Sequence, residues 1–245
     1  MLPFEPISRV TVVKCLGPRL VIFFKTFALF YVLYPKHEST IGYCLFKCAP
    51  ILSLIGFVYM YGVKSSLSKQ DYAMKILLGL VFSCLGDACL VWPKYFLPGM
   101  GFFAITHILY IHAFGIRPLK LFILFALLPS LIFICIYVRE GFNLLTGLVC
   151  PAYGLLLVLM MWRAVAQLYK HEYSIPWTSI SCALGGLLFG LSDSLLAVSI
   201  FAQEKSLLST LILPTYYAGQ LLIAVSVVDS QLTSLKANQT DVKRE

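Results

Sequence analysis

Apolar segments about twenty residues long recur along the whole chain, and they constrain its fold more than any other feature. Such a segment, coiled as an α-helix, crosses a hydrocarbon layer about 30 Å thick. The composition agrees, because 60% of the residues are hydrophobic and 12% are charged, whereas about a quarter of a soluble domain is charged. We therefore predict an all-α, polytopic membrane protein with about eight transmembrane helices, at 20–34, 44–63, 73–92, 97–116, 119–138, 142–162, 178–202 and 207–228.

Short polar connections join the predicted helices, so we expect a single membrane domain. An N-terminal segment at 1–19 precedes the eight-helix transmembrane domain at 20–228, and a tail at 229–245 follows it. Lys25 interrupts the first apolar segment, and no small-residue cleavage site follows it. This pattern favours a retained span over a cleaved signal peptide.

Positive charge is concentrated on one side of the predicted membrane. The side of both termini carries thirteen lysines and arginines, and the opposite side carries four. Because cytoplasmic segments are enriched in these residues, we expect both termini in the cytoplasm. The net charge of +8 follows from this pattern and does not indicate a nucleic-acid partner. The thirteen are Arg9, Lys14, Arg19, Lys64, Lys69, Lys75, Arg117, Lys120, Arg163, Lys170, Lys236, Lys243 and Arg244, and the four are Lys36, Lys94, Arg139 and Lys205.

The eight cysteines mostly lie inside predicted helices, where we interpret them as small, apolar packing residues. They have no CxxC spacing, and no histidine is placed to complete a zinc site. The sequence therefore predicts no metal site. The cysteines are Cys15, Cys44, Cys48, Cys84, Cys89, Cys135, Cys150 and Cys182.

A faint internal repeat relates the two halves of the chain. A shift of 106 residues aligns identical residues of the first and second halves of the chain, although apolar sequences also match by chance. Because four helices separate the two copies, the repeat favours two parallel four-helix halves, each contributing one aspartate to a shared centre. The superposed pairs are Asp87 and Asp193, Leu78-Gly79 and Leu184-Gly185, Leu85 and Leu191, Leu90 and Leu196, and Tyr110 and Tyr216.

Few ionisable residues lie within the predicted helices, where each costs about 3 kcal/mol or more. At about 1.5 Å per residue, Asp87 and Asp193 lie roughly 21 and 22 Å from the cytoplasmic edge. Lys47 can share that level, and His107 and Tyr217 lie roughly 15 Å down inward-running helices. Ionisable groups at this depth are usually functional, so we expect Asp87 and Asp193 at a functional site, with Lys47, His107, Tyr217 and Gln220 as its substrate-binding residues. Lys25 and His112 are the other ionisable residues within the predicted helices.

Structural roles are the alternative for each of these residues. Either aspartate can be a structural carboxylate paired with Lys47 or Lys25. His107 shares a helix face with Tyr110, and Tyr217 shares one with Gln220, so each pair can form hydrogen bonds between helices without chemistry. Lys25 can equally snorkel towards the membrane surface.

Four stretches, LVFSCLGDACLVW, FFAITHILYIHAFG, GLSDSLLA and PTYYAGQLLIA, resemble the YhhN-like lysoplasmalogenase family of eight-helix membrane hydrolases. The resemblance covers nearly all the predicted spans and is close to the vertebrate members, which reside in the endoplasmic reticulum membrane. It implies hydrolysis of the vinyl ether bond of lysoplasmalogens, 1-alkenyl-glycerophosphoethanolamine or -choline, to a fatty aldehyde and the glycerophospho-alcohol. It also implies that residues 20–228 are the catalytic domain and that Asp87 and Asp193 carry the reaction.

The chemistry of vinyl ether hydrolysis suits a pair of carboxyl groups. The slow step transfers a proton to the β-carbon and forms an oxocarbenium ion, which water captures. One protonated acid and one ionised carboxylate divide this work, as they do in glycoside hydrolysis. Lys47 can stabilise the ionised partner or hold the substrate phosphate, and the reaction needs no cofactor.

Three other functions also fit intramembrane aspartates. A transporter uses such groups to relay protons or bind cations, but helix-breaking Gly/Pro pairs at mid-span are scarce here. An intramembrane aspartyl protease carries Y-D and G-x-G-D motifs, whereas this chain has Ser192-Asp193 and Cys84-Leu85-Gly86-Asp87. A non-catalytic, lipid-binding scaffold protein is the third alternative. The sequence does not indicate an oligomeric state.

Overall fold

The computed structural model describes residues 9–62, 67–170, 175–203 and 207–228. These residues form eight α-helices: α1 (Arg9–Leu33), α2 (Ile41–Gly62), α3 (Leu67–Cys89), α4 (Phe96–Phe114), α5 (Leu121–Val138), α6 (Leu144–Ala166), α7 (Trp177–Phe201) and α8 (Ile212–Val225). Short 3-10 segments adjoin four of them: η1 (Pro93–Tyr95), η2 (Arg139–Gly141), η3 (Gln167–Tyr169) and η4 (Leu207–Leu211).

The predicted all-α fold with eight helices is confirmed. Most helix ends lie within a few residues of the predicted spans, but α1 begins at Arg9, well before residue 20, and η4 and α8 divide the last span. Six of the described helices, α2 to α7, are long and apolar enough to cross a membrane. Ser209–Val225 is a shorter apolar helix.

Local sequence explains where individual helices begin and end. Asn143 caps α6, because its side chain accepts a hydrogen bond from the Thr146 backbone nitrogen at 2.8 Å while Thr146 accepts one from the Asn143 nitrogen. This reciprocal arrangement satisfies backbone donors that the first helical turn leaves free. At the end of α4, Gly115 adopts a φ of 75°, a conformation that side chains other than glycine rarely accept.

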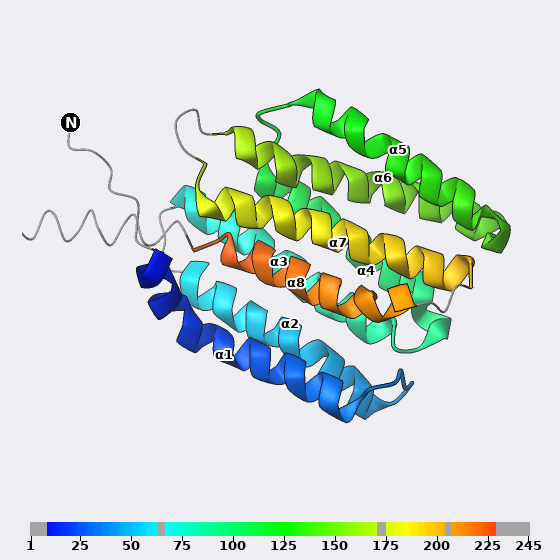
Figure 1. The fold of residues 1–245 in the computed structure, drawn as a ribbon, viewed down its shortest axis with the longest axis horizontal. Coiled ribbons are helices and arrows are strands. Elements are labelled where there is room, and N and C mark those ends of the chain that lie inside the picture. Colours follow the sequence, from blue (N-terminus) through cyan, green and yellow to red (C-terminus); the bar gives the residue numbers. More distant parts are fainter. Residues whose placement is uncertain (1–8, 63–66, 171–174, 204–206, 229–245) are drawn as a thin grey trace, which may run out of the picture.

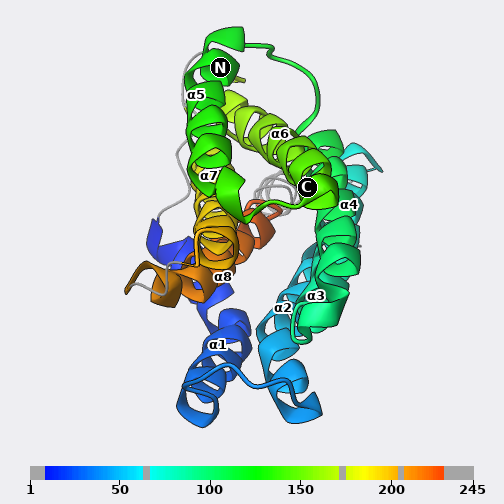
Figure 2. The same ribbon diagram turned by 90° about the vertical axis from the view of Figure 1, so that its right-hand side faces the viewer.

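The helices run nearly side by side along the long axis of the molecule (Figure 1). α1 and α2 form one edge of the bundle and α5 and α6 the other, while α3, α4, α7 and α8 fill the centre (Figures 1 and 2). α3 packs on α4 as α7 packs on α8, and the cross-contacts of α2 with α8 and of α6 with α4 correspond in the same way. This packing agrees with two parallel four-helix halves.

Two glycines allow α7 and α8 to approach closely at the centre. A Cβ atom added to Gly185 would lie 2.9 Å from the carbonyl oxygen of Gly219, and one added to Gly219 would lie 2.9 Å from the backbone nitrogen of Phe189. Small residues at a helix contact permit such approach in membranes. The contact sets the position of α8, which carries three polar residues of the candidate site.

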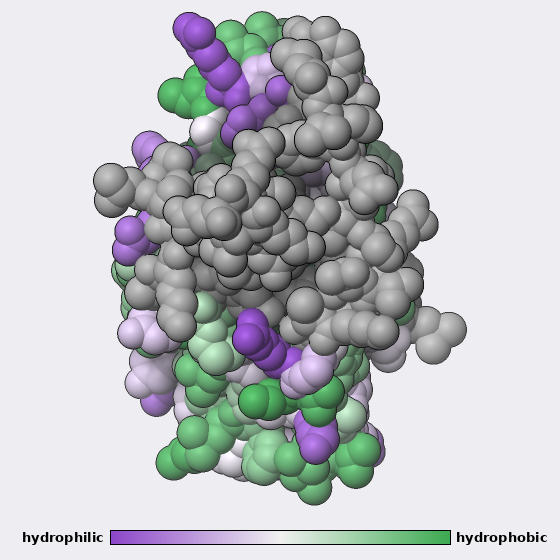
Figure 3. Space-filling view, turned by 90° about the vertical axis from the view of Figure 1, so that its left-hand side faces the viewer, coloured by the Kyte–Doolittle hydropathy of each residue, from purple (hydrophilic) through white to green (hydrophobic). Residues whose placement is uncertain are grey.

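The surface of the bundle is apolar along the helices. On α5, Phe125 is 66% exposed and Phe133 is 68% exposed, as expected of side chains that face lipid. At the end of the bundle where α4 and α6 end and α5 and α7 begin, hydrophilic side chains appear among the apolar ones (Figure 3). That end carries the loops that the charge distribution predicts to be cytoplasmic.

Candidate active site

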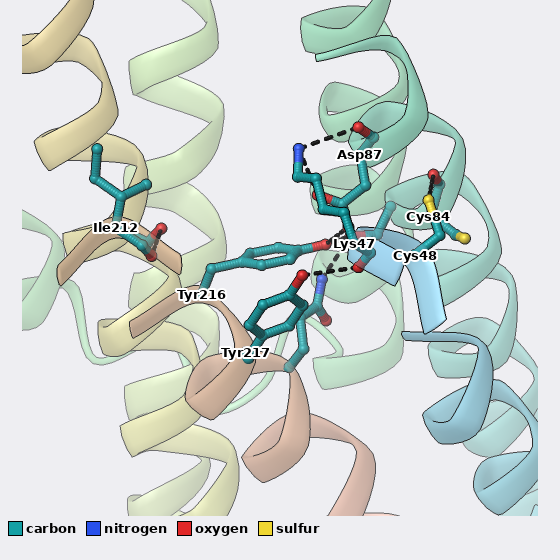
Figure 4. A network of polar contacts seen from close by, with 10 residues as sticks. Lys47, Cys48, Cys84, Asp87, Ile212, Tyr216 and Tyr217 are labelled. Atoms are coloured by element: carbon teal, nitrogen blue, oxygen red, sulfur yellow. Dashed lines mark hydrogen bonds and ion pairs between the residues drawn. The ribbon is translucent and has the colours of Figure 1, made fainter. Parts of the chain in front are cut away.

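Asp87 lies in the last turns of α3 and is surrounded by polar groups from two other helices. The Lys47 Nζ atom, from α2, is 3.4 Å from Asp87 Oδ1 and donates a hydrogen bond to the Asp87 carbonyl oxygen at 3.1 Å. The Tyr216 hydroxyl, from α8, donates to Asp87 Oδ2 at 2.5 Å. Figure 4 shows Lys47 and Tyr216 converging on Asp87, whose side chain is only 3% exposed. Both carboxylate oxygens therefore have partners.

A chain of buried hydrogen bonds extends from this pair across four helices. Ser83 Oγ is 2.6 Å from the Tyr216 hydroxyl and accepts a hydrogen bond from Gln220 Nε2 at 2.6 Å. The Tyr110 hydroxyl donates to Gln220 Oε1 at 2.7 Å. The Tyr217 hydroxyl donates to the Lys47 carbonyl oxygen at 2.7 Å (Figure 4). The network fixes α2, α3, α4 and α8 relative to one another, since a buried polar group without a partner is costly.

Asp193, on α7, has different partners. Its Oδ2 atom accepts a short hydrogen bond from the hydroxyl of Tyr153 on α6. His107, on α4, places Nε2 3.0 Å from the Tyr153 hydroxyl and 3.5 Å from Asp193 Oδ2. The His107 side chain is fully buried, whereas that of Asp193 is 12% exposed. His107 Nδ1 has no hydrogen-bond partner among the described residues.

Aromatic rings separate these two polar clusters. The Phe189 ring lies 5.0 Å from His107 and 5.5 Å from Tyr216, measured between ring centroids. Phe103 packs on both Phe189 and Tyr216. No hydrogen bond or ion pair between described residues joins Asp87 directly to Asp193.

An apolar pocket opens beside Asp193, between α4, α5, α6 and α7. Asp193 and Tyr153 form part of its wall, whereas Asp87 does not line it. Most of the remaining wall is aliphatic or aromatic, including Leu131, Leu157 and Phe201. A concave, mainly apolar pocket with a few convergent polar groups is the usual form of a small-molecule site.

The predicted site residues thus divide between two clusters. Asp87, Lys47, Tyr217 and Gln220 lie in one buried network, and Asp193 and His107 lie in the other. Lys47 is paired with Asp87, as one alternative proposed. The two other ionisable residues of the predicted spans, Lys25 and His112, have exposed side chains.

Two tyrosines in direct contact with the aspartates were missed from the sequence. Tyr216 carries no charge to mark it among the many membrane tyrosines. Tyr153, however, precedes Asp193 by 40 residues, the same separation as Lys47 from Asp87. The repeat of 106 residues places Tyr153 on Lys47 and could have identified it.

Comparison with known proteins gives a consistent set of relatives. The model of the YhhN family matches residues 42–227. Lysoplasmalogenase TMEM86A of Bos taurus is 39% identical over 232 residues, which cover 92% of this chain and 95% of that protein. Lysoplasmalogenase TMEM86A of Homo sapiens is 37% identical with the same coverage. Lysoplasmalogenase TMEM86B of Homo sapiens is 37% identical over 204 residues, 80% of each chain. No solved structure matches the chain.

Proposed function

The chain belongs to the YhhN family, and on that basis we propose that it is a lysoplasmalogenase, an ether hydrolase embedded in the membrane. Its substrates would be 1-alkenyl-glycerophosphoethanolamine or -choline, and its products a fatty aldehyde and the glycerophospho-alcohol. Similarity over 92% of the chain to proteins named for this activity supports the substrate class. The observation that carries the site is Asp193, a hydrogen-bonded carboxyl group on the wall of an apolar pocket.

The two aspartates act as a pair in this mechanism. One delivers a proton to the β-carbon of the vinyl ether, and the other supplies negative charge that balances the developing oxocarbenium ion. Preorganised charge aimed at a transition state is worth most where water is excluded. The near-complete burial of Asp87 and the fixed positions of its Lys47 and Tyr216 partners support such an arrangement.

The residues expected to bind substrate take more specific roles in this proposal. Lys47, Tyr217 and Gln220 do not line the pocket, so we propose that they hold Asp87 in place rather than contact the lipid. His107 acts on Asp193 through Tyr153. The alkenyl chain lies in the apolar pocket, where its burial is favoured by about 0.8 kcal/mol per methylene group.

Cellular placement is also proposed. We expect the endoplasmic reticulum membrane, with both termini in the cytoplasm, since the connections with excess positive charge share one side. A lysolipid could then enter the pocket from the bilayer without passing through water. Proton- or cation-coupled transport by the same carboxylates is the second candidate function, favoured only by their depth in the membrane.

Purified protein in nanodiscs provides the test. Given a lysoplasmalogen, it should release fatty aldehyde, detected by mass spectrometry, and it should leave the saturated 1-alkyl analogue intact. Asp87→Asn and Asp193→Asn should each nearly abolish release, because an amide neither delivers the proton nor carries the balancing charge. The double variant should be little worse than either single one, since residues acting as a unit are not additive.

The matched control is Asp71→Asn, which removes an exposed carboxylate paired with Lys75 and should leave aldehyde release unchanged. Full activity in a folded Asp87→Asn or Asp193→Asn protein would refute the pair. Ion flux in proteoliposomes without aldehyde would instead select the transporter.

A further inference from the structure

We propose that Asp193 is the proton donor of the pair and that Tyr153 and His107 are positioning residues that leave its acidic proton facing the pocket. Asp87 is the ionised partner. The catalytic part of this assignment rests on the proposed hydrolase function, whereas the protonation states rest on the hydrogen-bond geometry alone.

The cation beside Asp87 favours the ionised form of that residue. Lys47 Nζ lies 3.4 Å from Oδ1 and also contacts the Asp87 carbonyl oxygen. A nearby ammonium group and a donated hydrogen bond both favour the ionised form of a carboxyl group. With Tyr216 donating to Oδ2, neither oxygen of Asp87 is free to hold a proton for a substrate.

The partners of Asp193 are neutral. Tyr153 is a phenol, and His107 has a single hydrogen-bonded nitrogen, Nε2, because Nδ1 has no partner among the described residues. An imidazolium donates from both nitrogens, and a buried donor without an acceptor is costly, so the neutral ring fits this environment. Of the two carboxyl groups, Asp193 is the one that lacks a cation, so the proton belongs on Asp193.

The directions of the hydrogen bonds then place that proton. His107 Nδ1 is buried without an acceptor among the described residues, so the ring proton is placed on Nε2, which donates to the Tyr153 oxygen. The Tyr153 hydroxyl then donates its only proton to Asp193 Oδ2. Oδ2 is thereby the carbonyl oxygen of a protonated Asp193. Oδ1 makes no hydrogen bond with any residue in the described ranges, and Asp193 lines the pocket. The acidic proton on Oδ1 is left free to reach a substrate.

The internal repeat gives independent support. Tyr153 and Lys47 occupy equivalent positions, each 40 residues before its aspartate and each on the helix that precedes it. The two halves have thus kept the carboxyl group and changed its partner from a cation to a neutral hydroxyl. Such a difference is what separates an ionised carboxylate from a protonated one in paired acids.

The reaction balances with these roles. Asp193 Oδ1–H transfers its proton to the β-carbon, so the carbon–carbon double bond becomes single and an oxocarbenium ion forms. Water adds to the α-carbon and gives its proton to Asp193, which restores the acid and leaves a hemiacetal. The hemiacetal hydroxyl then loses its proton as the carbon–oxygen bond to glycerol breaks and the leaving oxygen gains one, which releases the aldehyde and the glycerophospho-alcohol.

Infrared spectroscopy tests the protonation states without substrate. The protein is labelled with carboxyl-¹³C aspartate, which separates its bands from those of glutamate, and is purified at neutral pH in a detergent without carbonyl groups. We expect one carbonyl band of a protonated aspartic acid, lost in Asp193→Asn and retained in Asp87→Asn and Asp71→Asn. Loss of the band in Asp87→Asn alone, or its absence from the wild type, would overturn the assignment.

A pair of tyrosine variants keeps the test decisive if an asparagine variant fails to fold. Tyr153→Phe removes the hydrogen bond to Asp193 and should shift the band to higher frequency. Tyr216→Phe, the matched change beside Asp87, should leave the band where it is. A shift in Tyr216→Phe and none in Tyr153→Phe would assign the proton to Asp87.

Aldehyde release measured on the same samples separates the two proposals. If the band behaves as expected but no aldehyde forms, the hydrolase function fails and the protonation states stand. If aldehyde forms and the band belongs to Asp87, the hydrolase function stands and the assignment of the donor fails.

Discussion

Replacing Asp87 by asparagine should destabilise the protein, whereas the same change at Asp193 should not. The reason is the cation that each change leaves behind. Asp87→Asn strands the buried ammonium of Lys47, which is 8% exposed as a side chain. Asp193→Asn strands no charge, and the new amide oxygen can still accept the hydrogen bond from Tyr153.

The distances set the size of the effect. At the observed separation of 3.4 Å, two unit charges in a medium of effective dielectric constant about 20 attract by about 5 kcal/mol. Removing one partner of a buried pair costs about 3–5 kcal/mol, so we expect a loss of that order for Asp87→Asn. For Asp193→Asn we expect a change within about 1 kcal/mol, the net worth of one hydrogen bond.

Unfolding in mixed micelles can be followed by the reaction of a thiol-specific dye with buried cysteines. Cys48 and Cys182 are both buried and free, so they report loss of the packed helices. Adding Lys47→Met to Asp87→Asn removes the stranded charge and should recover most of the lost stability. Equal stabilities for Asp87→Asn and Asp193→Asn, or no recovery in the double variant, would refute the role given to the Lys47 ammonium.

Other features of the chain give three further expectations. In Gly219→Ala the new methyl group would lie 2.9 Å from the backbone of α7, so the contact must widen and stability should fall by about 1–3 kcal/mol. The control is Gly56→Ala, whose methyl group meets open space. Equal unfolding midpoints of the two variants in the dye reaction would contradict this expectation. Burial, and then the charge of Lys47, lower the pKa of His37 below its usual 6.5. The unfolded chain therefore binds a proton at this residue more readily than the folded protein does. As the pH is lowered below 6.5, the wild type should lose more stability than His37→Gln. The sequon at Asn238 lies outside the described residues but in the predicted cytoplasmic tail, so endoglycosidase should cause no mass shift; a shift lost in Asn238→Gln would reverse the orientation.

The sequence predicted the helices well because hydrocarbon thickness imposes a length on each of them. It also placed Lys47 and Asp87 at the same depth, since helix rise gives the depth of a residue once the span is known, and a pair between an aspartate and Lys47 was one alternative it left open. Asp87 and Asp193 were expected at one shared centre because they lie at the same depth. Depth alone does not give the direction in which a side chain points around its helix. The structure places them in two clusters with Phe189 between their partners.

The parts of the candidate site that the sequence did not predict depend on how the helices pack side by side. Tyr216 reaches Asp87 from a helix far away in sequence, and the close approach of α7 and α8 at Gly185 and Gly219 helps to fix where α8 lies. The pocket exists because side chains from four helices leave space between them, which no local pattern encodes. Tyr153 is the exception, because the repeat contained its position.

The ion pair between Lys47 and Asp87 has an electrical consequence. Moving one elementary charge through a membrane potential of 100 mV involves about 2.3 kcal/mol. With the proposed protonation states, the ammonium and carboxylate cancel and Asp193 and His107 add nothing, so the resting site has no net charge on which the field can act. In the proposed mechanism the proton passes from Asp193 to the lipid and is replaced from water at the same depth, so no charge crosses the bilayer. A hydrolase built this way works at the same rate in polarised and depolarised membranes, whereas a proton-coupled transporter built on the same carboxylates would be driven by the voltage.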